Sequence, residues 1–228
     1  MTLVAEVSTE PRWARLVPIL TTARRKQWPE RIAWGGVPPL VRGVAKTVWR
    51  LEVEFGDGFP DPPFVVAGNH HSFLDPFLIG GIFGQKIRFL ALQDLFGNHR
   101  WLDFALEAFD VIPIRRGVTP LGAMRGALDH LDRGGVLGLF PEGTRHPVFD
   151  AQRARHGAAW LATHAGVPLV PVALSGTQRV LGVDNRLHIG RICIVVGPAM
   201  HGNGDGRPAI HDLTHRWGRW VADSLDAP

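Results

Sequence analysis

The sequence lacks the features that mark several classes of protein. Its 228 residues include one cysteine, Cys193, so a disulfide within the chain is excluded, and with it a disulfide-stapled secreted domain. No apolar run approaches the roughly 20 residues that a membrane-spanning helix needs. Residues 1–16 carry acidic side chains and no long apolar stretch, unlike a signal peptide. Hydrophobic residues make up 45% of the chain, which excludes disorder for most of it, so we expect a globular cytosolic protein.

Several common catalytic and ligand-binding patterns are also missing. The chain has no G-x-S-x-G nucleophile elbow, no G-x-x-x-x-G-K-[ST] phosphate loop and no G-x-G-x-x-G after a strand. Cys193 lies in an apolar run without a charged activator beside it, which favours a packing role over a nucleophilic one. The eleven histidines do not have metal-ligand spacing. His70 and His71 with Asp75 could in principle hold a metal, but the sequence offers no convincing further ligands nearby, so we expect no metal site.

Positive charge is concentrated in the first fifty residues. They contain nine basic and three acidic residues, a net charge of +6, whereas the remaining residues carry −2. Half of the eight tryptophans also lie there, namely Trp13, Trp28, Trp34 and Trp49. Tryptophan prefers the membrane–water interface and arginine is attracted to anionic lipids, so this composition favours a segment that lies on a membrane surface. The alternative is a solvated basic arm or one that binds nucleic acid.

From residue 64 onward, short apolar runs alternate with longer helix-like segments. The predicted strands, most of which lack the polar alternation of half-exposed strands, are Phe64–Gly68, Ile87–Leu92, Val111–Ile114, Val136–Phe140, Leu169–Ala173 and Leu187–Val196. The predicted helices are Pro76–Phe83, Arg100–Phe109, Pro120–Asp132, Arg155–Ala165 and Ala209–Ser224. Gly134 and Gly166 are placed where glycine commonly ends a helix. This order predicts an α/β fold with a mixed, largely parallel central sheet flanked by helices.

Residues 54–63 are rich in glycine, proline and aspartate, which is typical of a turn-rich boundary. We therefore predict two parts: residues 1–55 form a basic, Trp-rich helical segment on the membrane surface, and residues 56–228 form the α/β domain. On this division, deletion of residues 1–50 is expected to leave the α/β domain folded.

The segment Asn69–Asp75, NHHSFLD, directly follows a predicted buried strand. Open α/β sheets place reactive groups at the ends of strands, and a histidine there is suited to accept a proton from a hydroxyl near neutral pH. Asp75 lies five residues after His70, where a turn can bring the carboxylate to the imidazole. Asp75 followed by Pro76 is also typical of a helix N-cap with proline at the first helical position, and one carboxylate can serve both purposes.

Three further segments lie at or within predicted strands. The run Ile112–Gly117 places Arg115 and Arg116 at the end of a strand, where a guanidinium is suited to bidentate phosphate binding. The segment Phe140–Arg145, FPEGTR, contains a Pro-Glu-Gly sequence that is by itself a common turn. Val170–Ala173 is a strand with an internal proline.

In this order, the four segments resemble the motifs of the glycerolipid acyltransferase family, which includes bacterial 1-acylglycerol-3-phosphate acyltransferases. That family is marked by N-H-x-S-x-x-D, I-x-R, F-P-E-G-T-R and V-P-V, and four ordered motifs are far more specific than one. The resemblance covers about residues 60–180. It leaves open whether Arg115 or Arg116 binds phosphate, and the register of the second motif favours Arg116.

The resemblance implies direct acyl transfer. His70 is the general base on a hydroxyl of the acceptor, and Asp75 orients the imidazole. The hydroxyl attacks a thioester without an acyl-enzyme, which agrees with the absence of an activated serine or cysteine. The donor is acyl-CoA or acyl-carrier protein, and no metal or bound cofactor is required. Backbone N–H groups near the Glu142–Gly143 turn or at the start of the helix at Pro76 are the candidates for stabilising the oxyanion.

A phosphate-binding site is implied as well. It comprises Arg116, with Arg115 as the alternative, together with Arg145, Thr144 and the backbone of Gly143. Glu142 is expected to hydrogen-bond a hydroxyl or to support an arginine rather than to contact the phosphate.

The activity implied is transfer of a fatty acyl group to lysophosphatidic acid, giving phosphatidic acid for phospholipid biosynthesis. The enzyme is expected as a peripheral protein on the cytoplasmic face of the cell membrane, in contact with anionic phospholipids and not with nucleic acid. One alternative is the same chemistry on glycerol-3-phosphate or another lysolipid. Others are a metal-dependent phosphohydrolase built on His70, His71 and Asp75, and a membrane-binding module without catalytic activity.

Overall fold

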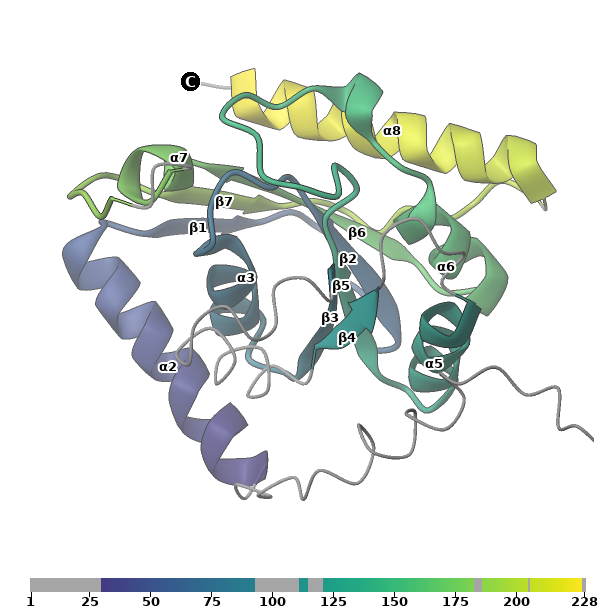
Figure 1. Cartoon of the computed structure of the whole chain (residues 1–228), viewed down its shortest axis with the longest axis horizontal. Coiled ribbons are helices and arrows are strands. Elements are labelled where there is room, and N and C mark those ends of the chain that lie inside the picture. Colours follow the sequence, from purple (N-terminus) through teal and green to yellow (C-terminus); the bar gives the residue numbers. More distant parts are fainter. Residues whose placement is uncertain (1–29, 93–110, 115–120, 183–185, 205, 227–228) are drawn as a thin grey trace, which may run out of the picture.

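A seven-stranded sheet lies at the centre of the described part of the chain (Figure 1). The computed structural model describes residues 30–92, 111–114, 121–182, 186–204 and 206–226. The strand order is β1-β7-β6-β2-β5-β3-β4, and only β6 and β7 are antiparallel neighbours. The strands are β1 (Glu52–Phe55), β2 (Phe64–Gly68), β3 (Ile87–Leu92), β4 (Ile112–Ile114), β5 (Val136–Leu139), β6 (Leu169–Ser175) and β7 (Cys193–Val196).

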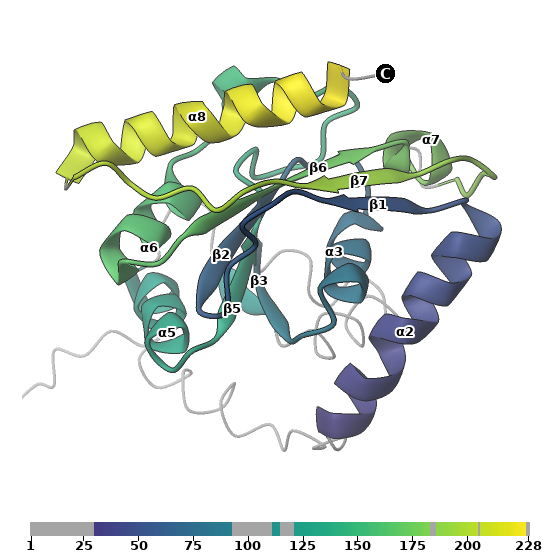
Figure 2. The same cartoon turned by 180° about the vertical axis from the view of Figure 1, so that it is seen from behind.

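Helices cover both faces of this sheet (Figures 1 and 2). One face carries α2 (Glu30–Val48) and α3 (Asp75–Phe83), and the other carries α5 (Leu121–Asp132), α6 (Gly157–Ala165) and α8 (Gly206–Asp226). The 3-10 helix η3 (Ala151–Arg153) precedes α6, and the short helix α7 (Thr177–Val180) follows β6. None of the helices in these ranges is long and apolar enough to cross a membrane.

Strand β2 contributes side chains to two separate cores. Phe64 and Val66 pack with α2 and α3, whereas Val65 and Ala67 face α5, α6 and α8. All five residues of β2 are buried, which is why the run has no polar alternation. Burial of each large apolar side chain contributes about 1.5–3 kcal/mol. The centre of the sheet is therefore a rigid support for the loop that follows β2.

The predicted fold class and much of the predicted element order are confirmed. Phe64–Gly68 and Ile87–Leu92 are strands with the predicted bounds. Gly134 and Gly166 follow α5 and α6 with φ angles of +81° and +65°, a conformation that glycine adopts without strain.

One predicted strand is shorter than expected, and one predicted helix lies outside the described residues. The run Leu187–Val196 is a strand only over Cys193–Val196, because its first part lies in an exposed segment that is held by an isolated bridge between Leu187 and Leu181. Cys193 itself is partly buried in β7, and burial raises the pKa of its thiol, as expected for a packing residue. The predicted helix Arg100–Phe109 lies outside the described residues.

The sheet also contains a strand that we did not predict. Strand β1 is an edge strand paired in parallel with β7, and its alternation of glutamate with apolar residues is short and directly precedes the turn-rich segment. Ala45 and Trp49, in and just after α2, are buried in the core with Leu51. The α/β unit therefore includes residues before position 56. Deletion of residues 1–50 would remove Ala45 and Trp49 from this core, so we now expect that deletion to destabilise the domain.

Candidate active site

Two loops meet at one edge of the sheet, after β2 and after β5. These strands are parallel neighbours, so their carboxyl ends lie side by side. The loop after β2 carries His70, and the loop after β5 carries Glu142. The backbone N–H of His146 donates to the carbonyl of His70 at 2.9 Å, and the backbone N–H of His70 donates to Oε1 of Glu142 at 2.7 Å. The first and third predicted motifs thus form one site.

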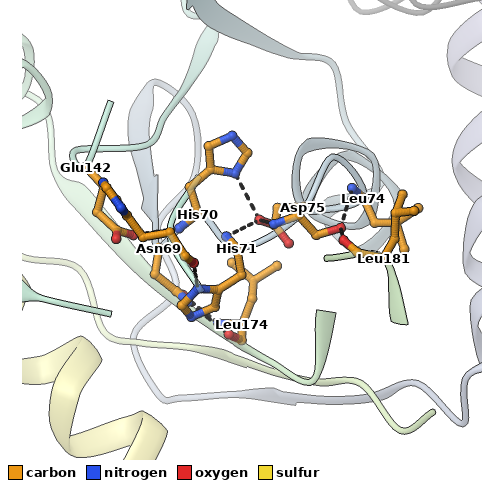
Figure 3. A network of polar contacts seen from close by, with 10 residues as sticks. Asn69, His70, His71, Leu74, Asp75, Glu142, Leu174 and Leu181 are labelled. Atoms are coloured by element: carbon orange, nitrogen blue, oxygen red, sulfur yellow. Dashed lines mark hydrogen bonds and ion pairs between the residues drawn. The ribbon is translucent and has the colours of Figure 1, made fainter. Parts of the chain in front are cut away.

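His70 and Asp75 form a hydrogen-bonded pair (Figure 3). Nδ1 of His70 lies 2.9 Å from Oδ2 of Asp75. A carboxylate accepts hydrogen bonds and does not donate them, so Nδ1 carries the proton and Nε2 presents its lone pair. The His70 side chain is 16% exposed, and its ring stacks on Phe140 with centroids 4.1 Å apart. The imidazole is therefore held in place and still partly exposed, as a general base requires.

Asp75 is fully buried and organises the loop that carries His70. Its Oδ2 also accepts the backbone N–H groups of His71 and Ser72, both at 2.7 Å. The expectation that Asp75 caps the following helix is wrong, because Asp75 is the first residue of α3 and no side chain caps that helix. The carboxylate instead points back into the loop, where buried N–H groups need an acceptor. Pro76 is the second residue of α3, one position later in the helix than predicted.

Glu142 is buried against the backbone of His70. The hydrogen bond from the His70 N–H occupies Oε1, and Oε2 has no hydrogen-bond partner within the described residues. Burial raises the pKa of Glu142 from 4.5 to about 7, although the His70 hydrogen bond works in the opposite direction. Glu142 therefore contacts the backbone of the loop that carries His70, whereas we expected it to hydrogen-bond a hydroxyl or to support an arginine.

Gly143, Thr144 and Arg145 complete the turn after β5. Gly143 has a φ of +72°, and its N–H donates to the carbonyl of Phe140 at 2.9 Å, so this amide is already engaged within the turn. Arg145 lies across the site, with its Cζ 3.5 Å from the ring centroid of Phe73. Burial lowers the pKa of Arg145, and the nearby negative charge of Asp75 opposes that effect. Arg145 is the one predicted phosphate-binding arginine within the described residues.

Arg115 and Arg116 lie outside the described residues. The strand that precedes them, β4, pairs with β3 at the far side of β5. Their proposed contact with phosphate stays a prediction.

The fourth motif, Val170–Val172, is structural. It lies in β6, and Val172 pairs with Gly68 at the end of β2. The side-chain amide of Asn69 bridges to the same strand, because Nδ2 donates to the carbonyl of Leu174 at 2.9 Å and Oδ1 accepts its N–H at 2.7 Å. These contacts attach the start of the loop after β2, which carries His70, to β6 (Figure 3).

The sequence patterns did not single out several residues of the site. Phe140 supports the imidazole of His70, and Phe73 contacts Arg145. Both occupy positions in the motifs, but neither position carries a chemical signal that reveals the contact. Arg155 lies next to the turn, since a Cβ at Gly143 would be 3.3 Å from its Nε. It precedes α6 and belongs to no motif.

The arrangement of His71 bears on the phosphohydrolase alternative. His71 is buried, and its Nδ1 donates to the carbonyl of His146 at 2.6 Å. Oδ2 of Asp75 already accepts three hydrogen bonds. Among the described residues, no group of three or more histidine, cysteine or acidic side chains is placed to hold a metal ion.

A histidine paired with a buried carboxylate, with a cation across the site, is an arrangement typical of enzymes that activate a hydroxyl. Residues 50–175 match the family model described as Acyltransferase. The chain belongs to this acyltransferase family, and within it to the group of 1-acyl-sn-glycerol-3-phosphate acyltransferases. The family resemblance inferred from the four motifs is thereby confirmed.

Three relatives illustrate the relationship. The chain is 31% identical over 179 residues to the 1-acyl-sn-glycerol-3-phosphate acyltransferase of Pseudomonas aeruginosa, an alignment that covers 77% of this chain and 69% of the relative. It is 27% identical over 142 residues to the Bacillus subtilis enzyme of that name, with coverages of 62% and 68%. It is 26% identical over 161 residues to a chloroplastic enzyme of Arabidopsis thaliana, and there it spans 45% of the relative's length.

A solved structure has the same fold. The crystal structure of the 1-acyl-sn-glycerophosphate acyltransferase from Thermotoga maritima matches with a TM-score of 0.68, over 95% of this chain and 90% of the other. The sequences are 20% identical, so this match supports the fold alone.

Proposed function

We propose that this enzyme transfers a fatty acyl group from a thioester donor to the free hydroxyl of lysophosphatidic acid, producing phosphatidic acid. The observation that carries the proposal is the pair His70–Asp75, with Arg145 held over the same loop. A base and a cation at one site fit an acceptor that has both a hydroxyl and a phosphate. The names of the relatives support the same acceptor.

The proposed step needs no covalent enzyme intermediate. Nε2 of His70 accepts the proton of the acceptor hydroxyl while the oxygen attacks the thioester carbonyl. The tetrahedral intermediate then collapses, the C–S bond breaks, and the thiolate leaves and takes the proton from the imidazolium. Asp75 stabilises that imidazolium through the hydrogen bond to Nδ1. The products are the ester and the free thiol.

The phosphate of the acceptor is proposed to bind Arg145 and Arg116, with Thr144 and the backbone near Gly143. Acyl-CoA and acyl-carrier protein present the same thioester, so either can serve as donor in this chemistry. No metal or bound cofactor takes part in the proposed step.

An acyl-transfer assay with the purified full-length protein tests the proposal. We expect oleoyl-CoA or oleoyl-acyl-carrier protein and 1-oleoyl lysophosphatidic acid to give phosphatidic acid and free thiol, with no loss of rate in EDTA. Glycerol-3-phosphate and lysophosphatidylcholine, measured in parallel, should be poorer acceptors. Faster acylation of either one would identify a different acceptor, and release of inorganic phosphate that EDTA abolishes would favour the phosphohydrolase.

We also propose that the enzyme works as a peripheral protein at the cytoplasmic face of the membrane. Helix α2 supports this, because Leu40, Val44 and Val48 recur at a spacing of four residues and are 66%, 43% and 44% exposed. Side chains four residues apart lie on one face of a helix. Arg42 and Lys46 are exposed beside this apolar stripe. Such a helix fits the surface of a bilayer that contains anionic lipid.

A second exposed apolar segment lies near the end of the same helix. Leu187 and Ile189 are 64% and 89% exposed. The segment that carries them continues into Ile192, whose N–H donates to the carbonyl of Trp49, one residue after α2. Exposed aliphatic side chains that are brought together in this way extend the proposed contact with lipid.

Substitutions in α2 test the membrane contact. We expect L40Q combined with V44Q to weaken flotation with vesicles of anionic and neutral phospholipid at both low and high salt, because apolar insertion is insensitive to screening. K46Q should weaken it at low salt only. R219Q, which removes an exposed charge on α8 at the opposite face of the sheet, is the matched control and should leave flotation unchanged. Equal binding by all four proteins would contradict the proposed surface.

A further inference from the structure

Phe73 and Arg145 form a contact that the mechanism above does not use. Phe73 lies between the base and its carboxylate in the sequence, at a position that bears no catalytic group. The guanidinium carbon of Arg145 is 3.5 Å from the centre of its ring, close enough for a stacked cation–π interaction. Arg145 comes from the loop after β5, so this contact joins the two catalytic loops.

We propose that Phe73 is a positioning residue that sets the place of the acceptor's phosphate relative to the base, by holding the guanidinium of Arg145. This proposal rests on the proposed function, because it takes Arg145 as a ligand of the phosphate. It adds a residue that acts through Arg145 and not on the reacting atoms.

The backbone on both sides of Phe73 is fixed. The hydroxyl of Ser72 donates to the carbonyl of Leu181 at 2.6 Å and accepts the N–H of Leu74 at 3.1 Å. The N–H of Ser72 donates to the buried carboxylate of Asp75. The ring of Phe73 is thus attached to a segment that has little freedom to move. A group stacked on that ring is held relative to His70, because both belong to the same turn.

Stacking is compatible with phosphate binding. A guanidinium that lies on an aromatic face donates its N–H groups in its own plane, so the ring does not compete with bidentate hydrogen bonds to a phosphate. The ring also restricts the rotation of the arginine side chain before the acceptor binds, so less conformational entropy is lost on binding. Arg145 is partly buried here, and cation–π interactions strengthen as the cation loses water. Phe73 therefore lowers the cost of ordering Arg145 for the acceptor.

The other contacts between the loops make this arrangement effective. The backbone N–H of His70 is held by Glu142, and the carbonyl of His70 by the N–H of His146. Residues on both sides of Arg145 thus contact the residue that carries the base. With the backbones fixed in this way, the contact with Phe73 holds the guanidinium of Arg145 close to the loop that carries His70.

The test is F73L, which keeps an apolar side chain but removes the aromatic face. In the acyl-transfer assay we expect the KM for lysophosphatidic acid to rise about 3- to 20-fold, with kcat and the KM for the acyl donor changed by less than about twofold. F73W should restore the acceptor KM, which a purely space-filling role would not produce. F83L, at the other end of α3, removes a ring that packs among other phenylalanines and should change stability without changing the acceptor KM.

Combining F73L with R145A distinguishes failure of this proposal from failure of the proposed function. If Phe73 acts through Arg145, F73L should have no further effect on the acceptor KM in the R145A background. If R145A raises the acceptor KM but F73L alone does not, or if its effect persists in the double variant, the positioning role is wrong. If R145A itself leaves the acceptor KM unchanged, the assignment of Arg145 to the phosphate is wrong.

Discussion

Replacing His70 with alanine is expected to lower kcat for acyl transfer by about 10²- to 10⁴-fold, the usual contribution of a general base. The variant should fold, because the imidazole is at the edge of the sheet and its ring packs only partly against Phe140. The buried carboxylate of Asp75 keeps the two backbone N–H donors of His71 and Ser72 when the imidazole is removed. The KM for lysophosphatidic acid should change little, since the proposed phosphate ligands are other residues, among them Arg145.

The measurement is initial rates of phosphatidic acid formation, together with thermal unfolding of each protein. H164A is a matched control, because the ring of His164 is also held by a hydrogen bond, in this case to the backbone carbonyl of Trp160 on α6. It should retain the activity of the parent enzyme. If H70A kept more than about a tenth of the parent kcat while remaining folded, the proposed general-base role would be wrong.

The centre of the fold could be predicted from the sequence because its strands are short, apolar and buried on both faces. Strand β2 is the clearest case: its five residues are all buried, and its bounds agree with the prediction. Strand β1 was missed because two of its four residues are glutamates and its place at the sheet edge depends on pairing with β7, over 130 residues away. Local composition carries no signal of that pairing.

The pairing of His70 with Asp75 could also be predicted, but its local geometry could not. The motif identified His70 and Asp75 and left open whether the carboxylate caps a helix. Oδ2 accepts two backbone N–H groups of the loop instead, a result that depends on the turn between the two residues. The contact of Glu142 with the His70 backbone depends on β2 and β5 being parallel neighbours, although β3 and β4 lie between them in sequence. Contacts across that strand order are set by tertiary structure, and motif spacing does not report them.

Replacing Arg145 with alanine is expected to raise the KM for lysophosphatidic acid about 10- to 150-fold, since a charge-assisted hydrogen bond contributes about 1.5–3 kcal/mol. The KM for the acyl donor should change by less than about twofold, because the donor thioester has no group that requires this cation. R145K should be intermediate, since lysine keeps the charge but cannot form the bidentate contact. The substitution is not expected to unfold the protein, because the side chain is only partly buried.

The comparison that decides the role of Arg145 is between phosphorylated and unphosphorylated acceptors. With lysophosphatidic acid, R145A should show the large increase in KM, whereas with monoacylglycerol the parent enzyme and R145A should perform equally poorly, because neither can use a phosphate contact. R216A is a matched control: Arg216 pairs with Asp212 on α8, on the other side of the sheet from α3, and its removal should leave both KM values unchanged. R116A should resemble R145A if both arginines bind the phosphate. An equal rise in the KM for donor and acceptor in R145A would instead place Arg145 at the thioester, and the cation across from His70 would then belong to the donor site.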